Sequence, residues 1–292
     1  MSRHLFLALT VPFTLAGCSL LTPLNIGLND NGYALQSGVA YGEDPRQRLD
    51  VYKPVPQLDS SPIVVFFYGG SWKGGERGDY RFVANALTSR GYIAVLPDYR
   101  VYPEHLFPDF VEDGAEAVRW ALEHAAELGG DLKRVYLMGH SAGAHIVAML
   151  TLDEHFLMNA GVPNGSLAGT IAIAGPYAFY PSKTANIAPI FAELTDEDLA
   201  RPVAFVDGSE APLLLLHGEE DTTVLPANTI ELADAVRNAG GSVTQSFYPG
   251  IGHFKILLTL SGRLPNYAPV LSDVAAFIDG TADLYSARDL VD

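Results

Sequence analysis

The chain has 292 residues, of which 48% are hydrophobic and 18% are charged, a composition typical of a globular protein rather than a disordered one. Its 34 acidic and 18 basic side chains give a formal net charge of -16. Such a surface repels phosphate backbones, which argues against a nucleic-acid partner. The only cysteine, Cys18, excludes an internal disulfide and a cysteine-based metal site.

The first seventeen residues have the pattern of an export signal. Arg3 precedes an apolar stretch from Leu5 to Ala16, and small residues follow. The apolar stretch is too short to span a bilayer as a permanent helix. We therefore expect residues 1–17 to be a signal peptide and the mature chain to work outside the cytoplasm.

The sequence "LAGC" at the end of this segment resembles the lipobox of bacterial lipoproteins. The resemblance implies that Cys18 is lipidated and becomes the new N-terminus, anchoring the protein to the cell envelope. Ser19 stands where an aspartate would resemble the inner-membrane retention signal, so the outer membrane is favoured in a host that has one. The alternative is an ordinary secretory signal with a chance cysteine.

The segment 18–45 is rich in Gly, Asn and Pro, which predicts a tether that leads into short edge strands. The alternating polar and apolar side chains of residues 48–54 are typical of an antiparallel edge strand. The continuous apolar run "PIVVFFYGG" (62–70) is typical of a strand that is buried on both faces of a parallel sheet.

From residue 79 onward, helical and strand patterns alternate. Helices are expected at 79–91, 107–130, 142–152, 227–240 and 269–280, and strands at 92–100, 133–140, 167–175, 211–218 and 242–250. This alternation predicts an α/β fold, with a mostly parallel central sheet and helices on both faces. Residues 176–210 break the pattern with four prolines and an acidic run, so we expect one domain over 46–292 with a small cap insertion there.

A serine between glycines follows the strand expected at 133–140. In "GHSAG", Gly139 and Gly143 carry no side chains that would collide in a tight strand-to-helix turn, so the Ser141 hydroxyl is expected to be exposed above the sheet. The five-residue pattern alone is weak evidence, but the strand before it and the helix after it are the context that the motif requires. This arrangement resembles the nucleophile elbow of the α/β-hydrolase fold.

In that fold an acid and then a histidine follow the serine, each at the end of a later strand. Asp221 comes after the strand expected at 211–218, and His253 after the one at 242–250. A serine hydroxyl needs a base to take its proton, so we expect Ser141, Asp221 and His253 to form a catalytic triad. Asp221 could instead cap a turn, and Glu219 and Glu220 are rival acids.

The loop "FFYGGSWKGG" looks like the HGG-x-W oxyanion loop of esterases related to feruloyl and acetylxylan esterases, hormone-sensitive-lipase-type enzymes and kynurenine formamidases. The resemblance covers roughly residues 48 to 280. It implies that backbone N–H groups of Gly70 and Ser71, with that of Ala142 after the nucleophile, form an oxyanion hole.

The same resemblance implies that Trp72 helps to form the wall of the substrate pocket. Tyr68 and His140 are predicted to line this pocket as well, with packing as the alternative role for His140. Tyr68 stands where many relatives have histidine, and Ser71 where the lipase group has a third glycine. These departures affect the assignment to a subfamily more than they affect the expected chemistry. His140 and His145 do not match a zinc-site spacing, so no metal is predicted.

These observations predict a serine hydrolase of the carboxylesterase type that needs no cofactor. Its expected substrates are small-molecule or glycan esters with short or mid-sized acyl groups, including acetylated or feruloylated sugars. An aryl formamidase would use the same triad and a similar loop, and a non-enzymatic surface lipoprotein would keep the fold as a binding module. The sequence does not indicate an oligomeric state.

Overall fold

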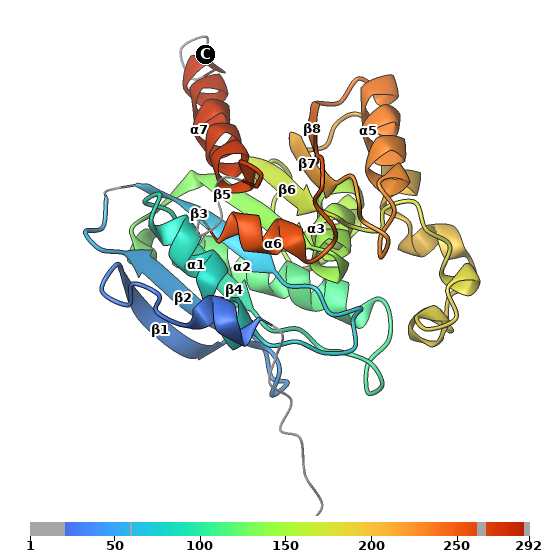
Figure 1. Cartoon of the computed structure of the whole chain (residues 1–292), viewed down its shortest axis with the longest axis horizontal. Coiled ribbons are helices and arrows are strands. Elements are labelled where there is room, and N and C mark those ends of the chain that lie inside the picture. The colour runs from blue at the N-terminus through green and yellow to red at the C-terminus, as the bar shows by residue number, and fades with distance from the viewer. Residues whose placement is uncertain (1–20, 59, 262–266, 289–292) are drawn as a thin grey trace, which may run out of the picture.

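The computed structural model describes residues 21–58, 60–261 and 267–288, and the signal segment 1–17 and Cys18 lie outside this part. Its central feature is one eight-stranded sheet with the strand order β1-β2-β4-β3-β5-β6-β7-β8 (Figure 1). The strands are β1 (Tyr33–Ala40), β2 (Arg48–Pro54), β3 (Ser61–Phe67), β4 (Ile93–Pro97), β5 (Gly130–His140), β6 (Gly169–Ile173), β7 (Leu213–Gly218) and β8 (Val243–Tyr248).

The sheet is parallel from β4 across to β8. Only β2 runs in the opposite direction, so it pairs antiparallel with both β4 and the edge strand β1. Every residue of β3, β4, β6 and β7 is buried, as expected for strands that are covered on both faces. The predicted mostly parallel sheet is therefore confirmed.

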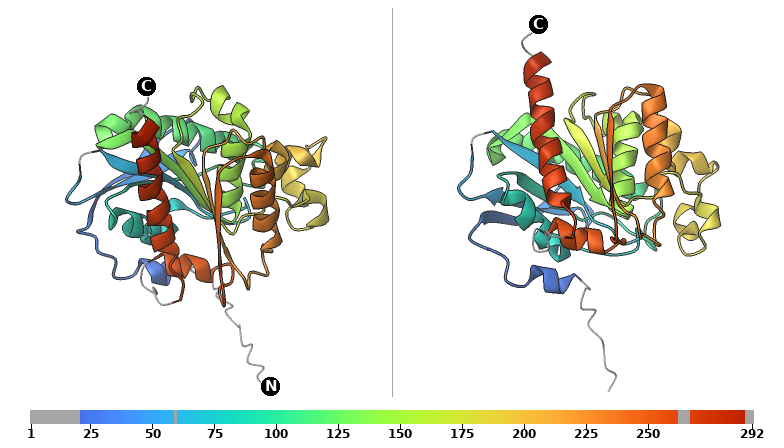
Figure 2. Two further views of the ribbon diagram at one scale, coloured as in Figure 1. Left: turned by 90° about the horizontal axis from the view of Figure 1, so that it is seen from above. Right: turned by 45° about the horizontal axis from the view of Figure 1, so that its top comes forward.

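Helices cover both faces of this sheet (Figures 1 and 2). The helices α1 (Arg81–Thr88), α6 (Lys255–Leu260) and α7 (Val270–Arg288) lie on one face, and α2 (Asp109–Leu128), α3 (Ala142–Leu152) and α5 (Ala227–Ala239) lie on the other. The chain steps from β3 to β4 in one direction and returns to β5 in the other. Right-handed crossovers therefore place α1 and α2 on opposite faces. A short helix, α4 (Glu154–Asn159), follows α3.

The segment that precedes β2 is docked on the domain, which corrects the predicted tether for residues 21–45. A 3-10 turn, η1 (Thr22–Asn25), brings Asn25 beside the start of α1. There its side-chain amide donates to the carbonyl of Asp79 (2.8 Å) and accepts from the N–H of Phe82 (3.0 Å). Because these bonds satisfy groups at a helix start, they fix this stretch of chain to the fold. β1 then adds the expected edge strand.

The cap insertion at 176–210 consists of short 3-10 turns and loops. The turns are η3 (Pro181–Lys183), η4 (Ala188–Phe191), η5 (Glu197–Ala200) and η6 (Pro202–Phe205). Three of them have proline in the first turn, where its fixed φ is favourable and its missing N–H costs nothing. The cap lies beside α3 and α5 and appears in yellow in Figure 1.

Within the described ranges, no helix combines the length and the apolar character that are needed to cross a membrane.

Candidate active site

Ser141 lies in a strained turn between β5 and α3. Its backbone has φ 56° and ψ -119°, a conformation that a side-chain-bearing residue rarely adopts. A Cβ added at Gly139 would overlap the carbonyl of Gly143, and one added at Gly143 would overlap the carbonyl of Phe67 in β3. The two glycines therefore allow the turn to pack directly against the neighbouring backbone, as the motif predicts.

The structure brings Ser141, His253 and Asp221 together from the ends of β5, β8 and β7. Nε2 of His253 lies 2.9 Å from Oγ of Ser141, and its Nδ1 lies 2.7 Å from Oδ2 of Asp221. The carboxylate accepts the Nδ1–H, so Nε2 is left to accept the serine proton. The rival acids Glu219 and Glu220 are both exposed at the surface.

The Asp221 carboxylate is held from every side. Its Oδ1 accepts the backbone N–H groups of Thr223 and Val224, each at 2.9 Å, so the turn-capping alternative also describes this residue. Burial opposes ionisation. Hydrogen bonds from His217, His253 and the Val224 N–H outweigh burial and hold the pKa of Asp221 well below its usual range. The carboxylate is therefore an anion at neutral pH.

The predicted oxyanion donors belong to two segments that meet at Ser141, the loop after β3 and the start of α3. A Cβ added at Gly69 would lie 2.9 Å from Cβ of Ser141, so the loop after β3 passes directly beside the nucleophile. Gly70 has φ 142° and Ser71 has φ 54°, and both residues are exposed. Ala142 begins α3, where the N–H has no partner within the helix. Among the residues that the structure describes, none accepts a hydrogen bond from the N–H of Gly70, Ser71 or Ala142.

Tyr68 does not line a pocket, and its prediction as a pocket residue is wrong. The side chain is fully buried beneath the loop after β3, where its hydroxyl donates to Oδ1 of Asp98 (2.9 Å). Its ring stacks on Tyr80 and Tyr99, with centroids 5.3 and 4.7 Å away. A Cβ at Gly75 would lie 2.8 Å from this ring, so Tyr68 supports the loop from below.

His140 is also a supporting residue rather than a pocket residue. It is buried, and its Nε2–H donates to the backbone carbonyl of His253 at 3.0 Å. The two rings lie 4.8 Å apart. Burial, with a smaller contribution from the neighbouring His253, lowers the pKa of His140 to about 3. His140 is therefore neutral at neutral pH, and it ties the loop that carries His253 to the strand that precedes Ser141.

Trp72 is packed under the cap instead of forming an open pocket wall. Only 2% of the residue is exposed, and its ring stacks between Phe110 of α2 and Phe179 of the cap. Phe191 and His145 contact its ring edge-on, with centroids 5.2 and 5.0 Å away. We call these five residues the aromatic cluster. It joins the loop after β3 to the cap by ring packing.

His145 ties the cap to α3. It is fully buried, and its Nε2–H donates to the carbonyl of Ala200 in η5 at 2.9 Å. Burial lowers the pKa of His145 to about 4, so the ring is neutral at neutral pH.

Two further residues, Arg77 and His217, support the site and were not predicted from the sequence. The Arg77 N–H donates to Oδ1 of Asp98 at 2.6 Å, the same oxygen that Tyr68 contacts. His217 is the penultimate residue of β7, four residues before Asp221. A charged or imidazole side chain at the end of a fully apolar run was the available signal for His217, whereas nothing in the sequence pairs Arg77 with Asp98.

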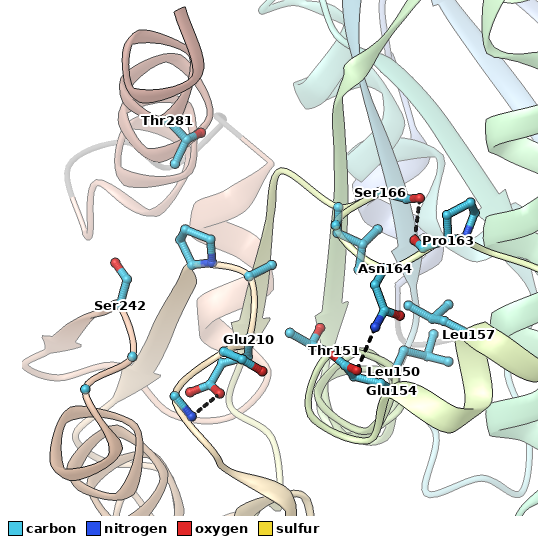
Figure 3. Close-up of a pocket in the computed structure, with 18 residues that line it drawn as sticks. Leu150, Thr151, Glu154, Leu157, Pro163, Asn164, Ser166, Glu210, Ser242 and Thr281 are labelled. Carbon is cyan, nitrogen blue, oxygen red and sulfur yellow. Dashed lines mark hydrogen bonds between the residues drawn. The ribbon is translucent and has the colours of Figure 1, made fainter. Parts of the chain in front are cut away.

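The opposite end of the sheet holds a separate cavity of about 560 Å³ (Figure 3). It lies at the amino ends of β6 and β7 and is lined by Thr151, Glu154, Asn164, Ser166 and Glu210, among others. None of the predicted site residues lines it.

Comparison with known proteins gives one family and a set of relatives. A family model described as BD-FAE matches residues 49–236. The probable isoprenylcysteine alpha-carbonyl methylesterase ICMEL1 of Oryza sativa subsp. japonica is 30% identical over 243 residues, which cover 75% of this chain and 57% of that protein. The carboxylesterase NlhH of Mycobacterium tuberculosis is 33% identical over 207 residues, which cover 65% of this chain and 61% of that protein. The chain thus spans somewhat more than half the length of these relatives.

Solved structures with the same fold include esterase B from Lactobacillus rhamnosis with a C6-C4 SN3 inhibitor, with a TM-score of 0.80 at 18% identity over 92% of this chain and 94% of that one. A truncated carbohydrate esterase from gut microbiota has a TM-score of 0.74 at 19% identity over 87% of this chain and 98% of that one. These similarities confirm the predicted α/β-hydrolase fold.

Proposed function

The chain belongs to the BD-FAE family, and we propose that it is a carboxylesterase-type serine hydrolase with Ser141 as its nucleophile. The single observation that carries the proposal is the continuous hydrogen-bonded array from Asp221 through His253 to Ser141, beside three backbone N–H groups that have no partner in the described structure. Relatives named as esterases and carboxylesterases support the same reaction class.

Acylation begins when Oγ of Ser141 attacks the ester carbonyl carbon while its proton passes to Nε2 of His253, 2.9 Å away. The carbonyl π electrons move to oxygen, and the N–H groups of Ala142 and of Gly70 or Ser71 stabilise the oxyanion. Asp221 remains ionised and stabilises the imidazolium. The carbon–oxygen bond to the leaving alcohol then breaks, and His253 donates the proton to that alcohol.

Deacylation repeats these steps with water. His253 takes a proton from the water, whose oxygen attacks the acyl carbon of the Ser141 ester. Collapse of the second tetrahedral intermediate releases the acid, and the proton returns to Oγ of Ser141.

The proposed substrates are small-molecule or glycan esters with short or mid-sized acyl groups, including acetylated or feruloylated sugars. Gly70 and Ser71 are exposed in the loop that passes beside Ser141. An ester group on a larger molecule can therefore approach the nucleophile. The cap contains only short turns, which suits compact acyl groups better than long lipid chains. The carbohydrate esterase among the structures of the same fold is consistent with a glycan ester but does not identify one.

The test is hydrolysis of p-nitrophenyl acetate and of N-formylkynurenine by purified protein, with Ser141→Ala as the inactive variant. Ser166→Ala in the cavity of Figure 3 is the matched control, because it removes the same hydroxyl at the other end of the sheet. We expect ester turnover that is lost only in Ser141→Ala. Faster turnover of the formamide would favour a formamidase, and no turnover of either substrate by folded protein would favour a binding module.

We also propose that the protein is exported and anchored to the bacterial cell envelope by a lipid on Cys18, in the outer membrane where the host has one. The support is the charged, apolar and small-residue pattern of residues 1–17 and the "LAGC" sequence. Export from the native host followed by mass spectrometry tests this: the mature N-terminal peptide should begin at an acylated Cys18. In Cys18→Ala the protein should lose its membrane fraction, and an unmodified Cys18 in the exported protein would refute the anchor.

A further inference from the structure

His217 is a second histidine beside Asp221. It is the penultimate residue of β7 and is fully buried. Its Nε2 lies 3.3 Å from Oδ2 of Asp221, the oxygen that also contacts His253, and 2.9 Å from the carbonyl of Val224. Its Nδ1 lies 2.7 Å from Oγ1 of Thr229 in α5, a residue that is also fully buried.

The partners of His217 assign its tautomer. Nε2 faces a carbonyl oxygen and a carboxylate oxygen, both of which only accept, so Nε2 carries the hydrogen. Nδ1 faces the hydroxyl of Thr229, which donates to it. The Nε2–H donates to the Val224 carbonyl and also approaches Oδ2 of Asp221, and Thr229 holds the ring in this orientation.

Resting on the function proposed above, we propose that His217 is a positioning residue for the catalytic acid: its Nε2–H, oriented by Thr229, fixes the oxygen of Asp221 that faces His253. Oδ1 accepts the N–H groups of Thr223 and Val224, and Oδ2 accepts the Nδ1–H of His253. Nε2 of His217 lies 3.3 Å from the same Oδ2. The carboxylate therefore cannot rotate without breaking several buried hydrogen bonds.

The arrangement has a chemical consequence for the proton on His253. Asp221 has to stay an anion while His253 carries the serine proton, since its role is to orient and stabilise the imidazolium. A second donor on Oδ2 makes that oxygen less basic, in agreement with the lowered pKa of Asp221. Without this donor, Oδ2 would bind the imidazolium proton more strongly, and His253 would release it less readily.

The test compares His217→Gln with His217→Asn. The amide nitrogen of glutamine reaches the position of Nε2 and keeps a donor for Asp221, whereas asparagine is too short to reach it. Thr229→Val is the second probe, because it removes the hydroxyl that orients His217 but leaves the imidazole in place. Each variant is compared with wild type by kcat, KM, the pH profile of kcat/KM on p-nitrophenyl acetate, and melting temperature.

We expect His217→Asn to lower kcat by about tenfold to a hundredfold with KM within about twofold, since the acid is no longer held in the productive geometry. The acid limb of its pH profile should move to higher pH. His217→Gln should restore most of the activity, and Thr229→Val should give an intermediate loss. A downfield proton NMR signal from the Nδ1–H of His253 should shift in His217→Asn but remain in place in His217→Gln.

The positioning role would be overturned if His217→Asn and His217→Gln had equal activity and equal pH profiles. It would also be overturned if both variants lost activity equally together with stability. The NMR comparison decides the matter if the wild type hydrolyses no ester, because it reports on the hydrogen bond and not on turnover. In that case the proposed function fails. The positioning role is refuted separately if the His253 Nδ1–H signal does not shift in His217→Asn.

Discussion

At the carboxyl ends of β5, β7 and β8, polar side chains converge beside backbone N–H groups that have no partner in the described structure. At the amino ends of β6 and β7, several polar side chains around the cavity of Figure 3 pair with one another or with the backbone, and Oε1 of Glu210 is left without a partner. The side-chain amide of Asn164 donates to Glu154 at 2.9 Å, and the hydroxyl of Ser166 donates to the carbonyl of Pro163 at 2.6 Å. The comparison shows that cavity volume does not locate a reaction site. A reaction site is located by catalytic side chains that converge on one point, together with hydrogen-bond donors that have no protein partner.

The two ends also differ in backbone strain. Ser141 and Gly70 have positive φ, and at Gly70 an added Cβ would overlap the carbonyl of Gly74. At the other end, Gly165, Gly208 and Gly240 also have positive φ, but a glycine adopts this conformation without strain, whereas Ser141 bears a side chain. Strain at the carboxyl ends is therefore combined with close backbone packing, which holds the unusual conformation in place.

The largest effect is expected from Asp221→Asn, which neutralises the acid without changing its size. It should lower kcat by about four orders of magnitude, because His253 loses the anion that sets its tautomer and stabilises its charged form. Glu154→Gln, the same neutralisation at the cavity of Figure 3, should leave kcat within about twofold. Steady-state kinetics on p-nitrophenyl acetate measures both. A similar loss in the two variants would break the contrast between the two ends.

The next effect is expected from Gly70→Ala. The methyl group cannot be placed without moving the loop, so an oxyanion donor is displaced and kcat should fall by about 10²–10³. Gly165→Ala, with φ 76° and open space around it, should keep full activity and lose about 1 kcal/mol of stability. Urea unfolding and kinetics on the same preparations separate the two outcomes. Full activity in a folded Gly70→Ala would exclude this loop as an oxyanion donor.

A smaller loss is expected from His140→Leu, which removes the donor to the backbone carbonyl of His253. We expect kcat to fall by about tenfold as the base loses its position, while His140→Gln, which keeps a donor, should recover most of it. Thr151→Val removes a buried hydroxyl that bonds to the carbonyl of Val147 near the other end of α3, so it should lower the melting temperature but not kcat. An inactive His140→Gln would indicate that packing, not the hydrogen bond, is required.

The smallest effect concerns stability against pH and involves His145. The pKa of this buried histidine is lowered to about 4, below the ordinary value of about 6.5, so between these values the unfolded chain binds a proton that the folded chain does not. Its contribution to stability is therefore fully present above pH 6.5 and decreases as pH falls. Between pH 6.5 and pH 5 the loss should be about 2 kcal/mol.

Urea unfolding of wild type and His145→Phe at pH 7 and pH 5 checks this expectation. The variant should lose about 2 kcal/mol less than wild type over that range. An identical pH dependence in both proteins would show that His145 takes up its proton in the folded state.

Much of the fold and the site follows from local pattern. The apolar runs that become β3, β5 and β7 are recognisable because parallel strands are buried on both faces, and the positions of Ser141, Asp221 and His253 just beyond strand ends follow from that register. The short helices α4 and α6 were not predicted as separate elements, because a six-residue helix is too short to show a periodicity.

Side-chain direction and long-range packing account for the rest. Tyr68 and Trp72 lie in the loop after β3, and only the positions of Asp98 and of the cap determine that one side chain points beneath the loop and the other into the aromatic cluster. Similarly, the docking of residues 21–45 depends on Asn25 finding Asp79 and Phe82, more than fifty residues away. Neither relation leaves a trace in local sequence pattern.

The direct backbone contact between Gly143 and β3 has a consequence for how new specificities can arise. The turn around Ser141 packs directly on the loop after β3, with no side chains between the two backbones. We therefore expect these two segments to behave as one rigid unit in which few substitutions are tolerated. The cap attaches to that unit through ring stacking and through hydrogen bonds from His145 and Lys73 to the carbonyls of Ala200 and Asn186. Laboratory evolution toward new esters should therefore accumulate its changes in residues 176–210 and leave the unit unchanged.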